Sequence, residues 1–197
     1  MKRLIILLFC LLPLNLSAGN NIISEGEMTQ DFPMFMVLMP GTMDCPGGGY
    51  VEDPILGTIC HPDANIHFRN ALITMVVDGT PSDMLVGNAF MTINANWNEN
   101  GEGPYYGEYS LILDHYSWSW TGSWNAKREF NGAEWVSVIK FVAYATGIDA
   151  PPYQLRMEVI GLSKSLYPAS YELLNLLFGT SFTGPEGIGT YTIKQVD

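Results

Sequence analysis

An alternation with a period of two runs through residues 117–127. Every second position is apolar or small, namely Trp118, Trp120, Gly122, Trp124 and Ala126. The positions between them are polar, namely Ser117, Ser119, Thr121, Ser123, Asn125 and Lys127. Because successive side chains of a strand point to opposite faces, this pattern predicts a β-strand between an apolar and a polar environment.

Similar segments recur along the chain and are separated by turn residues, as in a meander of antiparallel strands. They span residues 32–39, 66–77, 84–97, 105–113, 135–146, 153–162 and 187–194. Together with residues 117–127 they make about eight strands, enough to close a small barrel and remove its edges. We therefore predict an all-β fold, an antiparallel eight-stranded closed barrel.

Three segments interrupt this rhythm. Residues 19–31 are mostly polar and read as a loose lead-in. Residues 41–64 read as a long loop without regular structure, rich in Gly and Pro. Residues 168–178 carry leucines at helical spacing before Gly179, which predicts a short helical insert packed on the sheet. No repeat or linker divides residues 19–197, so we expect a single domain.

The first 18 residues have the features of a secretory signal peptide. Met-Lys-Arg is followed by an apolar run from Leu4 to Leu14, and cleavage is expected after Ala18, with Ser17 or Asn20 as neighbouring choices. The run is far shorter than the roughly 20 residues of a membrane-spanning helix. A retained anchor is the alternative. We predict export to the periplasm or the medium, with no membrane span after cleavage.

Cysteine usage agrees with export. Cys10 lies in the signal segment, and the bulky Phe9 before it argues against a lipoprotein. Cys45 and Cys60 remain as an even pair, which predicts a disulfide in an exported chain. Such a bridge would contribute roughly 3 kcal/mol by restricting the unfolded chain. Two buried free thiols are the alternative.

The charge balance excludes one class of partner. The chain has 9 basic and 20 acidic residues, a net charge of −11, and loss of Lys2 and Arg3 would leave 7 basic residues and −13. Such a surface repels nucleic acid and anionic lipid. We expect no nucleic-acid partner.

Four segments resemble the allene oxide cyclase-like barrels, which include plant cyclases, dirigent proteins and bacterial secreted proteins. They are Gly107-Glu-Tyr109, Trp120-Thr-Gly-Ser-Trp124, Tyr144-Ala-Thr-Gly147 and Glu186-Gly-Ile-Gly-Thr-Tyr191. The resemblance covers roughly residues 84–197 and implies a closed barrel of the calycin kind. The cysteine loop, residues 150–152 and the helical insert depart from the family, and no family active-site residue can be placed on this chain.

Metal and cofactor chemistry find little support. His61, His67 and His115 have no metal-binding spacing, although Asp114 beside His115 could orient an imidazole in a turn. Residues 96–101 lack the leading Asp of a calcium loop and read as a polar hairpin. We expect no metal and no cofactor.

The aromatic stripe has two interpretations. Trp118, Trp120 and Trp124 either fill the barrel core, as large rings do in small barrels, or form a ligand-lining wall with Tyr109 and Tyr144. Barrel mouths are common ligand sites. These five residues are the candidate ligand-binding residues, and both interpretations stay open.

Two classes of function follow. We predict a non-catalytic binding or interaction module for a small apolar ligand or a protein partner. The alternative is an isomerase or cyclase that shapes an apolar intermediate inside the barrel. An enzyme should place ionisable groups beside the aromatic wall, and the candidates are Arg69, Lys140, Arg156 and Glu158. The sequence leaves a homo-oligomer open.

Overall fold

The computed structural model describes residues 21–31, 37–39, 41–46, 49–53, 57–61, 64–132, 135–163 and 187–196. This part of the chain is all-β, with one short 3-10 turn, η1 (Asp83–Leu85). The predicted signal peptide, residues 1–18, and the predicted helix, residues 168–178, lie outside the described residues.

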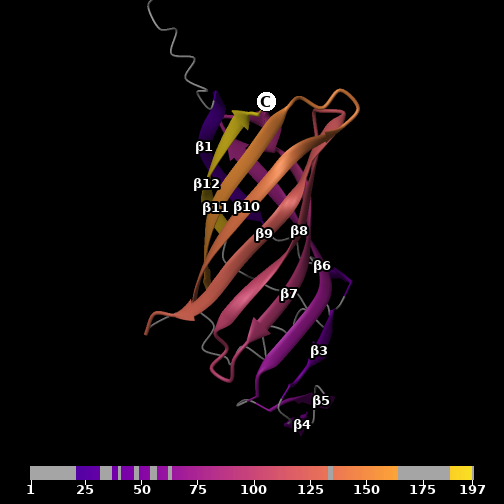
Figure 1. The fold of residues 1–197 in the computed structure, drawn as a ribbon, viewed down its shortest axis with the longest axis vertical. Helices are drawn as coiled ribbons and strands as arrows, with labels where there is room; N and C mark the ends of the chain where they lie inside the picture. Colours follow the sequence, from indigo (N-terminus) through magenta and orange to yellow (C-terminus); the bar gives the residue numbers. More distant parts are fainter. Residues whose placement is uncertain are drawn as a thin grey trace, which may run out of the picture.

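Eight strands form a closed ring. They are β1 (Ile22–Asp31), β6 (Ile66–Thr80), β7 (Gly87–Trp97), β8 (Gly103–Leu113), β9 (Trp118–Phe130), β10 (Trp135–Gly147), β11 (Tyr153–Ser163) and β12 (Gly187–Gln195). From β6 to β12 each strand pairs antiparallel with the next, β12 pairs with β1, and β1 pairs with β6 (Figure 1). The predicted all-β, antiparallel architecture is confirmed.

The closing strand is β1, so the prediction of a loose lead-in at residues 19–31 was wrong. Glu25 and Glu27 are exposed on its outer face, whereas Met28 and Gln30 are buried. The strand fits tightly beside the end of β6, because a Cβ on Gly26 would lie 2.0 Å from the carbonyl oxygen of Thr80. A strand whose inner face carries so few large apolar residues leaves almost no hydrophobic pattern to detect.

Residues 41–64 also contain more regular structure than predicted. β3 (Thr42–Asp44) pairs with β6, as does β2 (Val37–Met39), the described part of the strand predicted at residues 32–39; both follow β1 along the same side of β6. β4 (Tyr50–Asp53) and β5 (Gly57–Cys60) form a separate two-stranded sheet, which lies with β3 at the far end of the molecule from the C-terminus (Figure 1). The prediction of an irregular loop was therefore wrong. Strands of three or four residues are too short to show an alternation.

Two buried clusters support this framework. The ring core is made of large side chains from all eight ring strands and from η1, among them Met28, Met75, Leu85, Leu111, Trp120, Phe141, Leu155 and Ile193. The second, here called the disulfide cluster, contains Cys45, Cys60, Ala64, Ile66, Phe68, Ala71, Ala95 and Trp97. The Cys45–Cys60 disulfide is present, with 5.6 Å between its Cα atoms, which confirms the predicted pairing.

Candidate functional site

The three tryptophans of β9 point into the ring. Trp118, Trp120 and Trp124 are at most 8 % exposed. The indole Nε1 of Trp120 donates to the carbonyl oxygen of Met84 at 2.7 Å, and that of Trp124 donates to the carbonyl oxygen of Thr92 at 3.0 Å. Two of the three indole donors are thus satisfied by the protein's own backbone.

Neighbouring aromatic rings pack against these tryptophans. Trp118 and Trp120 meet edge to face with 5.0 Å between ring centroids, and Tyr109 meets Phe141 in the same way at 4.9 Å. Trp124 lies 6.4 Å from Phe141. These separations are typical of aromatic pairs in a protein core, and the rings contact one another along the inner face of the neighbouring strands β8–β10.

Tyr109 is the least satisfied member of this group. Its hydroxyl is buried and has no hydrogen-bond partner among the described residues, and burial raises the pKa of the phenol well above its usual range. One charged side chain is buried among the described residues, Arg128, which follows Trp124 and Ala126 on the inner face of β9. The ionisable groups in contact within the ring core itself are phenols.

Tyr144 lies on the other side of the sheet. Its side chain is 47 % exposed on the outer face of β10, and its hydroxyl accepts a hydrogen bond from Gln154 Nε2 at 2.7 Å. The structure therefore brings together Tyr109, Trp118, Trp120 and Trp124 and places Tyr144 apart from them. Ligand binding by these residues stays a prediction.

The other candidates are scattered. His61 and His115 are exposed, and His67 is half-buried on β6. The described part of the chain contains no group of three His, Cys, Asp or Glu side chains placed to hold a metal ion. Arg69 donates to the carbonyl oxygens of Phe68 and Ala95 and to Asn96 Oδ1.

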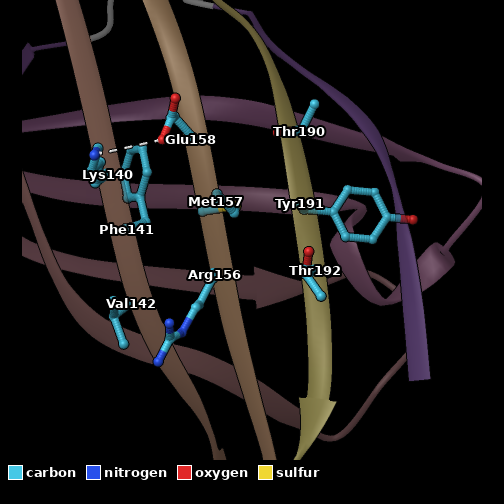
Figure 2. Close-up of a pocket in the computed structure, with 9 residues that line it drawn as sticks. All are labelled: Lys140, Phe141, Val142, Arg156, Met157, Glu158, Thr190, Tyr191 and Thr192. Carbon is cyan, nitrogen blue, oxygen red and sulfur yellow. Dashed lines mark ion pairs between the residues drawn. The ribbon is translucent and has the colours of Figure 1, made fainter. Parts of the chain in front are cut away.

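The remaining three ionisable candidates share the outer face of β10 and β11. Lys140, Arg156 and Glu158 line a hollow of about 310 Å³, together with Val142 of β10 and two threonines of β12 (Figure 2). The strand register explains the grouping, since Lys140 lies opposite Glu158 and Glu158 opposite Thr190, while Val142, Arg156 and Thr192 form the adjacent row. The buried Phe141, Met157 and Tyr191 lie between the two rows.

Polar contacts organise this hollow. Lys140 Nζ lies 3.8 Å from Glu158 Oε2, a pair drawn at one end of the hollow in Figure 2. Arg156 Nε donates to Gln154 Oε1 at 2.9 Å, and Gln154 donates in turn to Tyr144. We name the chain Tyr144–Gln154–Arg156 the outer relay. Sequence reasoning identified Arg156 and Tyr144 separately but missed Gln154, because their contact depends on the register between β10 and β11.

An apolar row borders the hollow. Val138, Ile160 and Ile188 are register neighbours on β10, β11 and β12, and they are 37, 50 and 61 % exposed. Contiguous exposed apolar side chains are typical of surfaces that contact other molecules. The outer face of β10–β12 therefore combines an apolar row with a charged, hydrogen-bonded hollow.

Comparison with known proteins identified no relative of this chain. No protein-family model matches the chain, and no curated protein or solved structure matches it. Among the residues that the structure describes, no helix has the length and apolar character needed to cross a bilayer. The disulfide is compatible with an exported protein.

Proposed function

We propose that this chain is an exported, closed eight-stranded barrel of the allene oxide cyclase-like kind that works as a non-catalytic binding module. Its binding surface is the outer face of β10–β12. A short helical insert near residues 168–178 remains part of the proposal. Export is supported by the N-terminal apolar run and by the disulfide, which is typical of oxidising compartments.

The position of the ionisable candidates carries the proposal. General acid–base or electrostatic catalysis needs such groups within hydrogen-bond reach of the reacting atoms. Arg69 is bonded to backbone carbonyls and an asparagine, and Lys140, Arg156 and Glu158 lie on the outer face. None of the four is buried among the aromatic rings, and the buried Arg128 on the inner face of β9 is engaged by the ring of Trp97 and the carbonyl oxygen of Gly101. This arrangement favours binding outside over chemistry inside.

Packing of the interior supports the same conclusion. In small barrels the inward side chains commonly fill the space. Trp120 and Trp124 pack against other aromatic rings, and their indole N–H groups already donate to backbone carbonyl oxygens. These two indole N–H groups are therefore not free to bind a ligand.

One observation favours the alternative, an isomerase or cyclase acting on an apolar intermediate in the ring. The hydroxyl of Tyr109 is buried and unpartnered among the described residues, and such a group is costly unless a ligand or water binds it. A substrate carbonyl could accept its hydrogen bond. A single phenol with a strongly raised pKa is a weak acid for this task, so we rank the alternative second.

Ligand location separates the two proposals. The full exported chain is purified from its own compartment, ligands are identified by native mass spectrometry, and their site is mapped by amide hydrogen exchange. We expect protection on β10–β12. A parallel titration with an apolar dye, followed by tryptophan fluorescence, should show no saturable quenching. Stoichiometric quenching with protection around Tyr109 would contradict the outer-face proposal.

A further inference from the structure

The described basic residues are unevenly distributed over the molecule. Six are described: Arg69 and Arg128 donate to backbone carbonyls, and Lys127 pairs with Glu129. The other three, Lys140, Arg156 and Lys194, share the outer face of β10–β12, with Lys194 opposite Gln154. A chain with a net charge of −11 thus gathers half of its described positive charges on one surface.

Arg156 is held in a defined orientation. Its Nε is bonded to Gln154, which is itself anchored on Tyr144, whereas the two terminal amino groups have no partner within the described ranges. These two groups form the planar fork that matches the two oxygens of a carboxylate. Because the outer relay already restricts the side chain, less rotamer freedom is lost when a ligand binds.

The surroundings of Arg156 select the charge of the ligand. Lys140 offsets Glu158, so the charged residues lining the hollow sum to one positive charge. Glu25 and Glu27 lie on the neighbouring strand, opposite Thr192 and Thr190. They would repel a multiply charged anion such as phosphate more than a single carboxylate. Val142 and the ring of Tyr144, both partly exposed, offer apolar contact beside the fork.

From this geometry we infer that the hollow on β10–β12 binds a single carboxylate group, with Arg156 as its anchor and Gln154 as a positioning residue. The inference rests on the proposed outer-face function and names its ligand chemistry. A hollow of about 310 Å³ is at the lower end of small-molecule sites. The carboxylate can belong to a free organic acid or to the C-terminus of a peptide.

The test titrates benzoate, and its neutral analogue benzamide, into the isotope-labelled full chain. Backbone amide signals and the Arg156 Nε–H signal are followed by NMR. We expect saturable chemical-shift changes on benzoate addition, centred on Arg156 and Thr192. The affinity for benzamide should be lower by at least ~tenfold, because its neutral amide cannot form the charged, two-oxygen contact with the guanidinium. An acetylated dipeptide with a free C-terminus, compared with its amide, distinguishes a chain end from a free acid.

Matched variants identify the anchor. Arg156→Lys keeps the charge and loses the fork, so benzoate binding should fall by about tenfold. Gln154→Ala should weaken binding less and shift the Arg156 Nε–H signal before any ligand is added. Lys127→Gln removes a positive charge outside the hollow and should leave benzoate binding unchanged.

The outcomes separate the inference from the proposed function. Equal shifts by benzoate and benzamide on β10–β12 would overturn carboxylate recognition and leave outer-face binding in place. Shifts centred on the Trp124 indole would place the site in the ring and overturn both. The inference is also overturned by an absence of benzoate shifts at tens of millimolar, or by equal losses in Arg156→Lys and Lys127→Gln.

Discussion

The ring and the disulfide end of the molecule bury apolar surface in different ways. In the ring, long strands pair on both sides, and their inward residues meet in one cluster. At the other end, β3, β4 and β5 are only three or four residues long, and their cluster is joined by the Cys45–Cys60 bond. Strands this short bury too little surface to be stable alone. At this end the disulfide therefore supplies the stabilisation that closure of the ring supplies to the long strands.

The two regions also treat polar atoms differently. Arg128, an inward residue at the end of β9, is 3 % exposed, lies 4.8 Å above the ring of Trp97 in the disulfide cluster and donates to the carbonyl oxygen of Gly101. In the described ring core, polar contacts come from neutral groups, such as the Tyr191 hydroxyl that accepts from the amide of Ser82. A buried charge is tolerated where a π face and backbone carbonyls compensate it.

The largest expected effect is in the ring. Trp120→Ala empties a fully buried site and removes the hydrogen bond to Met84, which should cost about 3–5 kcal/mol of unfolding free energy. Urea unfolding measures the loss. The control is Ile112→Ala on the outer face of β8, where the side chain is 54 % exposed and the change should be small. A Trp120→Ala variant as stable as the parent would show that the ring core does not depend on its largest side chain.

The second effect tests the disulfide end. Replacement of Cys45 and Cys60 by Ser should cost roughly 3 kcal/mol, since the bond closes a loop with a sequence separation of 15. Amide exchange should rise in β3–β5 and at the start of β6, while β9–β11 stay protected. Equal loss of protection in both regions would mean that they unfold as one unit. Mass spectrometry without reductant should show the parent two hydrogens lighter than its reduced form.

The third effect is alkaline destabilisation of the ring. Burial raises the folded-state pKa of Tyr109 above the unfolded value, so its contribution is fully present below about pH 10 and is lost as the pH rises further. The slope should approach about 1.4 kcal/mol per pH unit. The unfolding free energy should therefore fall more between pH 9 and pH 11 in the parent than in Tyr109→Phe. An identical pH dependence would show that Tyr109 is not the group responsible.

The sequence predicted the ring better than the disulfide end for a physical reason. Strands β6–β12 are long enough for apolar and polar positions to alternate several times, so their existence was visible. The inner face of β10 was not, since Tyr144 was expected on the aromatic wall and is exposed on the outer face. β1 closes the ring with glycine, methionine and glutamine inward, and its pairing depends on β6 and β12. The outer relay was equally hidden, since Tyr144 meets Gln154 only through the register of β10 and β11. Contacts between strands are not encoded in the periodicity of either strand.

The smallest expected effect concerns the unpartnered hydroxyl in the ring. Tyr109→Phe removes a buried group that has no partner among the described residues and keeps the ring against Phe141, so stability should stay equal or rise by about 1 kcal/mol. Tyr191→Phe is the matched comparison, because it leaves the Ser82 amide without its acceptor and should lose about 1 kcal/mol. Chemical denaturation of both variants gives the difference. If Tyr109→Phe is the less stable of the two, the Tyr109 hydroxyl has a partner in solution, and the interior then becomes the place to search for a ligand.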